Sequence, residues 1–149
     1  MLGEETPRTL FVSEEVFRAV TSPFDGYPNQ ALHSEFRQTL DAFLEGGEMS
    51  VGDDPKTKAS DALMARVCPV DDGFFDFRIT SPHPQIRAFG GFAEKDTFVA
   101  ITWNYRDAIS DNFDAEVSRC KIEWQKLFGS TEPFKGKNLD EHLSNWIAV

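Results

Sequence analysis

Four residues near the middle of the chain have side chains suited to holding a phosphate group: Arg78, Arg87, Tyr105 and Arg106. Apolar and polar residues alternate over 75–79, which predicts a half-buried strand with Arg78 turned away from the core. Arg87 lies on the next predicted strand, and Tyr105 and Arg106 follow the third. Two or three guanidinium groups beside a phenol could bind a phosphodiester and stabilise the charge that develops during its cleavage.

A structural explanation competes with this one. Arg78 and Arg87 could instead form ion pairs with Asp76, Glu94 or carboxylates of the predicted helices. Spacing alone favours these ion pairs over a ligand site.

The other chemistry-bearing residues do not form a known motif. His33, His83 and His142 are far apart and do not match a metal-ligand spacing. No glycine-rich loop joins a predicted strand to a helix, so we expect no metal and no cofactor. Cys120 lies on the apolar face of a predicted helix and Cys68 precedes a proline, and we expect both to be buried, inert thiols.

The elements that must position these residues follow an α+β order. Periodicity predicts strands at 9–12, 75–79, 86–92 and 98–103, and helices at 13–20, 29–45, 60–67, 111–128 and 138–148. The stretch 49–58 is expected to be a polar connection. The three central strands are neighbours in sequence, so they favour an antiparallel meander. The expected fold is a small antiparallel sheet, made of a short N-terminal strand and the three-strand meander, packed with helices.

The chain of 149 residues has the length of one domain, which we assign to 1–149. We expect a core region over 9–128 and a C-terminal helical extension over 129–149. The 14 phenylalanines are explained by this core, because most occupy positions that periodicity directs inward.

The net charge of −10 argues against nonspecific binding of nucleic acid, but the charge is unevenly distributed. Residues 1–72 carry a net −8, residues 73–103 are neutral, and residues 104–149 carry −2. The acidic excess therefore lies outside the segment that contains Arg78 and Arg87.

We expect a cytoplasmic protein that does not contact a membrane. No apolar run approaches the roughly 20 residues needed to span a bilayer. The acidic N-terminus lacks the basic flank and apolar stretch of a secretion signal, and two cysteines do not make a disulfide framework.

The central segment resembles a known family. Residues 75–79 (FDFRI), 86–92 (IRAFGGF) and 98–103 (FVAITW) are similar to the central hairpins of the RelE/HigB superfamily of bacterial toxins, above all its phage-derived HigB-like branch. Residues 43–47, followed by a predicted helix, resemble the helical hairpin before the family's sheet, and 10–12 would be its first edge strand. The resemblance covers about residues 9–128.

This resemblance implies a RelE-like fold with helices on one face of the sheet and a basic concave face opposite. It also implies metal-independent cleavage of messenger RNA on the ribosome, and an antitoxin protein as partner. By position, Arg78 matches the arginine of the family's "E-L-R" strand and Arg87 the arginine of its second strand. Tyr105 or Arg106 would stand near the late catalytic position.

Two alternatives follow from the acidic charge and the small number of basic residues. The chain could be a non-catalytic interaction protein of the same fold that binds a protein partner or a small ligand. It could also be an acidic mimic that engages a nucleic-acid-binding partner through 1–72. The sequence does not indicate an oligomeric state.

Overall fold

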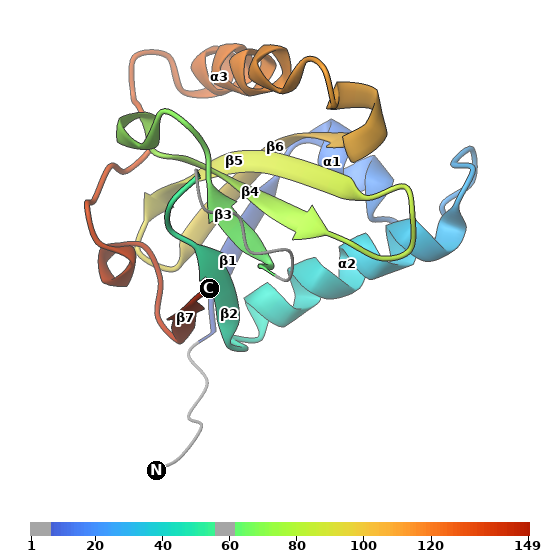
Figure 1. Ribbon diagram of the computed structural model, residues 1–149, viewed down its shortest axis with the longest axis horizontal. Helices are drawn as coiled ribbons and strands as arrows, with labels where there is room; N and C mark the ends of the chain where they lie inside the picture. The colour runs from blue at the N-terminus through green and yellow to red at the C-terminus, as the bar shows by residue number, and fades with distance from the viewer. Residues whose placement is uncertain (1–6, 56–61) are drawn as a thin grey trace.

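A curled, mixed sheet with helices on both faces organises the computed structural model, which describes residues 7–55 and 62–149 (Figure 1). The seven strands lie in the order β1-β6-β5-β4-β3-β2-β7. Neighbours from β6 to β3 pair antiparallel, whereas β1 pairs parallel with β6, and β2 pairs parallel with β3 and β7. The strands are β1 (Thr9–Val12), β2 (Met49–Gly52), β3 (Met64–Arg66), β4 (Phe74–Ile79), β5 (Ile86–Glu94), β6 (Thr97–Tyr105) and β7 (Trp146–Ala148).

The predicted fold class is therefore wrong. The sheet is larger than the expected four strands, and it is mixed rather than antiparallel. The difference comes from β2, β3 and β7, which form in segments that local sequence assigns to a loop and to helices. Short strands such as these depend on their pairing partners more than on their own propensity.

Two of the helices begin after a residue whose side chain caps them. α1 (Glu14–Ala19) begins after Ser13, whose hydroxyl accepts a hydrogen bond from the Val16 N–H at 3.3 Å. α2 (Gln30–Leu44) begins after Asn29, whose side-chain oxygen accepts from the Leu32 N–H at 3.1 Å. α3 spans Phe113–Phe128. The 3₁₀ turns are η1 (Val70–Asp72), η2 (Arg106–Ile109) and η3 (Leu139–Glu141). Among the described helices, none has the length and apolar character needed to cross a membrane.

The prediction of a helix at 60–67 is wrong over residues 62–67, which form no helix. Residues 60–61 lie outside the described part of the chain. Met64 and Arg66 belong to β3, where they pair with Phe77 and Phe75 of β4. The predicted polar connection likewise contains β2, whose Val51 pairs with Met64. The backbone hydrogen bonds of β3 go to a neighbouring strand, so tertiary pairing overrides the helical preference of this sequence.

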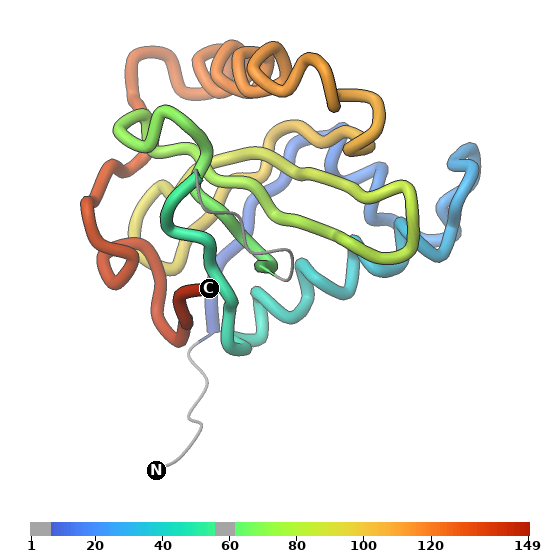
Figure 2. Tube along the Cα trace, in the orientation of Figure 1, coloured from blue at the N-terminus to red at the C-terminus, as the bar shows by residue number. Residues whose placement is uncertain are grey.

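The predicted C-terminal helix is also wrong, so 129–149 is not a helical extension. Leu139–Glu141 forms only the short turn η3, and Asn145 has a positive φ of 53° that ends any helical path. The chain then adds β7 to the edge of the sheet, beside β2. The trace in Figure 2 shows the C-terminus lying against that strand.

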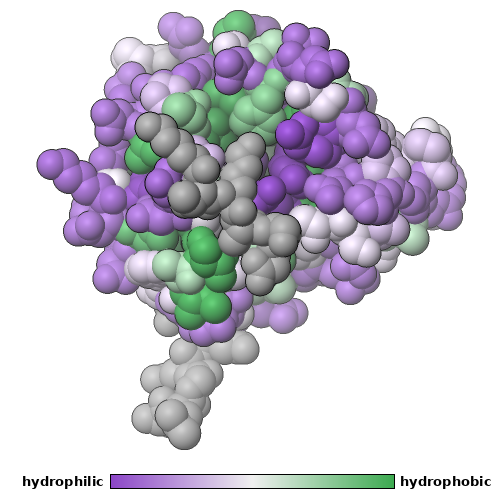
Figure 3. Space-filling model, viewed as in Figure 1, coloured by the Kyte–Doolittle hydropathy of each residue, from purple (hydrophilic) through white to green (hydrophobic). Residues whose placement is uncertain are grey.

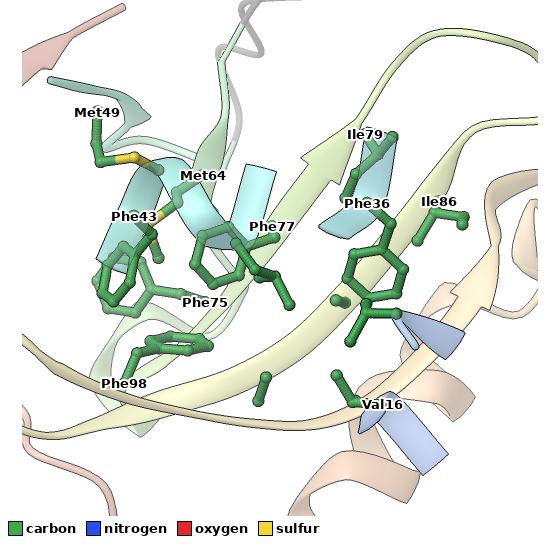
Figure 4. Packing of buried hydrophobic residues seen from close by; sticks show 14 of the residues in the cluster. Val16, Phe36, Phe43, Met49, Met64, Phe75, Phe77, Ile79, Ile86 and Phe98 are labelled. Carbon is green, nitrogen blue, oxygen red and sulfur yellow. The ribbon is translucent and has the colours of Figure 1, made fainter. Parts of the chain in front are cut away.

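A cluster of phenylalanines fills the face of the sheet beneath α1 and α2 (Figure 4). Phe77 of β4 packs edge-on against Phe43 of α2 and Phe98 of β6, with ring centroids 5.4 and 5.1 Å apart. These rings, together with Phe36 and Phe75, are fully buried. The expectation that the phenylalanines form the core is confirmed at these positions.

The opposite face of the sheet is covered as well. A second apolar cluster beneath α3 includes Phe74 and Phe89 of the sheet and Val117, Cys120 and Trp124 of the helix. The open basic face that the family resemblance implied is therefore replaced by a helix-covered face. β4 and β5 are consequently buried on both sides over most of their length.

Arg8 links two segments that are far apart in sequence. Its guanidinium donates hydrogen bonds to the carbonyl oxygens of Phe43 at 3.0 Å and of Ser144 at 2.7 Å, and it lies 3.7 Å from the Asp96 carboxylate. The side chain is buried, and burial lowers the pKa of Arg8 while Asp96 raises it. This arginine ties the start of β1 to the segment that leads into β7.

We predict that Phe77→Ala lowers the free energy of unfolding by about 3–5 kcal/mol, because it removes a fully buried ring and leaves a cavity. Urea unfolding followed by circular dichroism measures the change. The matched control is Phe11→Ala, since this side chain is 58% exposed and its loss is expected to change stability by less than about 0.5 kcal/mol. Equal effects of the two substitutions would contradict the core assignment.

Candidate functional site

A cavity of about 270 Å³ lies between the sheet and the start of α3. Three of its arginines come from different elements: Arg78 from β4, Arg87 from β5 and Arg106 from η2. Figure 3 shows strongly hydrophilic side chains on this side of the molecule, below α3. The structure thus brings together three of the four residues that the sequence singled out.

Strand register places the first two arginines side by side. Arg78 and Arg87 are direct partners in the antiparallel pairing of β4 with β5, so their side chains leave the same face of the sheet. This is the face away from Phe77, as the alternation over 75–79 predicts. Arg106 is brought to the same place because its N–H donates to the Gln85 carbonyl at 2.7 Å, just before β5 begins.

Arg87 is the most buried of the three, at 4% exposure. It donates to the Ile86 carbonyl at 3.2 Å and to the Gln85 side-chain oxygen at 3.0 Å. Burial, and then repulsion from Arg78 and from Arg106, lower the pKa of Arg87 to about 10, while the Asp76 carboxylate acts in the opposite direction. Arg87 therefore remains charged at neutral pH in a place where positive charge is crowded.

Asp76 is the site residue that sequence reasoning did not select. It lies on β4 two positions before Arg78, it is 4% exposed, and it lines the cavity. The alternation that directs Arg78 away from the core also directs Asp76 to the same face of the strand. The sequence pattern could therefore have identified Asp76 as a site residue. A buried carboxylate beside three arginines can accept a hydrogen bond from a hydroxyl or amino group of a ligand.

Other parts of the cavity wall are small or apolar. Gly52 of β2 and Ala65 of β3 are paired neighbours that leave room for the cavity. The Phe113 ring forms one wall, with the Arg106 guanidinium carbon 5.7 Å from its centroid. Cys68 also lines the cavity and is exposed, so the expectation of a buried thiol is wrong there. Cys120 is buried as expected, and burial raises the pKa of its thiol to about 12.

A fourth arginine beside the cavity is already engaged. The Arg66 Nε atom lies 2.6 Å from an Asp53 carboxylate oxygen, and its Nη2 donates to the Lys137 carbonyl at 2.8 Å. These contacts hold Arg66 within the protein. Arg106 differs, because its Nη1 atom is buried and has no hydrogen-bond partner in the described part of the chain.

Tyr105 does not join the arginines. In the β5–β6 pairing it lies opposite Ile86, a residue of the core beneath α2, and therefore on the other face of the sheet. Its hydroxyl lies 2.8 Å from the His33 Nε2 atom. The sequence placed Tyr105 beside Arg106, but neighbouring residues at the end of a strand point to opposite faces.

His33 forms a second polar centre, for which the sequence gave no signal. Its Nδ1–H donates to the Ala19 carbonyl at 2.8 Å, so in the neutral ring Nε2 accepts from the Tyr105 hydroxyl. The ring stacks on Tyr27 at 4.0 Å and meets Trp103 edge-on. Burial lowers the pKa of His33 and raises the pKa of Tyr105. These contacts fit a structural role.

The donor groups do not suggest a metal centre. Within residues 7–55 and 62–149, no group of three or more His, Cys, Asp or Glu side chains is placed to hold a metal ion.

Comparison of the chain with protein-family models, with curated proteins and with solved structures gives no match.

We predict that stability falls as the pH drops below about 6.5, the ordinary histidine pKa. Burial lowers the pKa values of His33 and His142 in the folded state, so the unfolded chain binds more protons in this range. The contribution of the two neutral histidines to stability is complete above their pKa in the unfolded chain. It is lost as the pH falls towards their lower pKa in the folded protein. Urea midpoints at pH 7.5 and 5.5 measure the loss.

The matched control for this prediction is the exposed His83. His33→Gln and His142→Gln should each reduce the pH dependence, whereas His83→Gln should leave it unchanged. A pH dependence that survives replacement of both buried histidines would contradict the assignment.

Proposed function

We propose that this protein binds a small anionic ligand in the cavity formed by Arg78, Arg87 and Arg106. The observation that carries the proposal is the convergence of three guanidinium groups from three elements on one cavity of about 270 Å³. Clustered guanidinium groups suit carboxylate and phosphate oxygens, because each presents several N–H donors in a planar fork.

Two further features support an anion. The Arg106 Nη1 atom is buried and has no hydrogen-bond partner in the described part of the chain. A buried donor without a partner costs free energy, and an anion in the cavity would supply the missing acceptor. A bound anion would also offset the repulsion that Arg87 experiences from its two arginine neighbours.

We predict that inorganic sulfate binds the protein at low ionic strength and that Arg106→Gln weakens this binding by about 10- to 100-fold, the range expected for one charged hydrogen bond. Isothermal titration calorimetry measures both. Arg37→Gln is the matched control, because Arg37 is an exposed arginine on α2 that pairs with Asp41. Absence of binding, or equal loss in both variants, would contradict the proposal.

A second candidate function is the RNA cleavage implied by the RelE/HigB resemblance. The convergence of Arg78, Arg87 and Arg106 favours it, since these side chains could stabilise a phosphate during attack by the neighbouring 2′-hydroxyl. Tyr105 faces the other side of the sheet, which leaves Asp76 as the carboxylate able to take the proton. An antitoxin and the ribosome with its messenger RNA are the partners that go with this candidate.

For this candidate we predict that induced expression stops bacterial growth and that Arg78→Gln combined with Arg106→Gln restores it. Tyr105→Phe should remain toxic, because this side chain is separated from the cavity. Immunoblotting confirms equal expression of all three proteins, and primer extension locates the RNA cuts. A harmless wild-type protein, or loss of toxicity in Tyr105→Phe alone, would contradict the candidate as drawn.

The compartment that we propose is the cytoplasm. Both cysteines are free thiols, and one of them is exposed, which suits a reducing environment.

A further inference from the structure

The C-terminal strap, residues 134–149, contains η3 and adds β7 to the edge of the sheet beside β2 (Figure 1). We propose that this strap is a pH-sensitive latch, which opens when the buried His142 takes up a proton and thereby frees the outer edge of β2. The latch does not depend on anion binding, because no residue of the strap lines the arginine cavity.

The hydrogen bonds of His142 leave no place for a second ring proton. The side chain is fully buried, and its Nε2 atom lies 2.8 Å from the Gly136 carbonyl oxygen. This oxygen can only accept, so the neutral ring carries its proton on Nε2. The Nδ1 atom is buried and has no hydrogen-bond partner in the described part of the chain. A proton on Nδ1 would create a buried donor without an acceptor, which costs free energy.

Three phenyl rings surround the imidazole of His142. The ring centroids of Phe75, Phe92 and Phe134 lie 5.1, 5.3 and 5.0 Å from its own. An aromatic ring can attract a cation, but Phe75 already holds the guanidinium of Arg66, whose central carbon is 5.2 Å from the ring centroid. A charged His142 would therefore lie beside a second positive charge in an apolar place.

Burial is the largest cause that lowers the pKa of His142. The hydrogen bond to the Gly136 carbonyl raises this pKa, the charge of Arg66 lowers it, and the carboxylates of Glu141 and Asp53 raise it. The net direction is downward, so the ring is neutral while the strap is closed. In an open strap the ring is hydrated, and it takes up a proton near the ordinary histidine pKa of about 6.5. Acid therefore favours the open state.

The backbone around His142 holds the strap in place. Its carbonyl accepts from the N–H of Asp96, in the β5–β6 turn, at 2.8 Å. The N–H and hydroxyl of Ser144 donate to the Asp96 carboxylate at 2.7 and 2.8 Å. The Asn145 carbonyl accepts from the N–H of Met49, at the start of β2, at 3.0 Å. Displacement of His142 therefore loosens β7, and β2 is left with unpaired N–H and C=O groups along its edge.

Hydrogen exchange of the full chain, followed by NMR at single amides, tests the latch. The reporters are the amides of Ser144 and Met49, because both take part in the contacts of the strap. We expect their protection factors, corrected for the intrinsic effect of pH on exchange, to fall about tenfold from pH 7.5 to pH 5.5. The reason is that pH 5.5 lies one unit below the ordinary histidine pKa of about 6.5, which the open strap restores.

Three variants assign the effect. His142→Gln should abolish the tenfold fall, since glutamine can still donate to the Gly136 carbonyl but gains no charge. His33→Gln should leave the fall intact, because this ring lies outside the strap. Ser144→Ala removes the hydroxyl contact with Asp96 and should lower protection equally at both pH values.

The His142→Gln variant also controls for titration of other groups. It keeps the charged side chains that face His142 or the strap, which are Arg66, Asp53, Glu141, Asp96 and Arg8. Any pH effect of these groups would survive in His142→Gln, and a tenfold fall in that variant would overturn the latch.

An amide of α2, that of Leu40, distinguishes opening of the strap from global unfolding. Global unfolding releases both buried histidines, so we expect protection of Leu40 to fall about 100-fold over the same pH range and about tenfold in His33→Gln. If the amides of Ser144 and Met49 follow Leu40 in both proteins, the strap opens only with the whole fold and the latch is overturned.

A second measurement decides the question if His142→Gln does not fold. Nitrogen-15 NMR of the wild-type histidine rings reports the tautomer and the titration of His142 directly. We expect the Nε2–H tautomer at pH 7.5 and a pKa below about 6.5. An Nδ1–H tautomer, or a ring that titrates at or above that value, would overturn the proposal.

Discussion

Burial of β4 and β5 on both faces is the constraint on which the rest of the structure depends. α2 covers one face with a phenylalanine core, and α3 covers the other with a smaller cluster around Trp124. Any polar residue on the inner part of these strands must then lie in a shielded place. Asp76 and Arg87 are held there by register, and the cavity exists because the neighbouring positions on β2 and β3 are Gly52 and Ala65. The site is thus a consequence of how the sheet is covered.

The same constraint explains why the arginines can act in an acidic protein. A guanidinium on an open surface is screened by water and salt, so its interactions are weak. Charges interact more strongly where they are buried, and Arg78 and Arg106 both contribute to lowering the pKa of the buried Arg87. The electrostatic environment of the cavity is therefore set by a few residues on three elements more than by the net charge of the chain.

Several features could be predicted from sequence because they depend on neighbours along the chain. The alternation over 75–79 correctly placed Arg78 away from the core, and periodicity correctly predicted the helix at 29–45, which is α2. The predictions failed where hydrogen-bond partners come from distant segments. β3 forms because β4 lies beside it, and β7 forms because β2 offers a free edge almost 100 residues earlier in the chain. No local pattern contains that information.

The sequence by itself determined which side chains leave the core face and which residues form the phenylalanine core, since strand and helix periods are local properties of the backbone. Only the tertiary structure decided which of the exposed candidates meet. The fold places Arg106 and Asp76 beside Arg78 and Arg87 in one cavity. It places the Tyr105 hydroxyl on the opposite face of the sheet, in contact with His33. Arg106 follows β6 in η2, and its N–H donates to the Gln85 carbonyl, so its place beside β5 depends on contact with a distant segment.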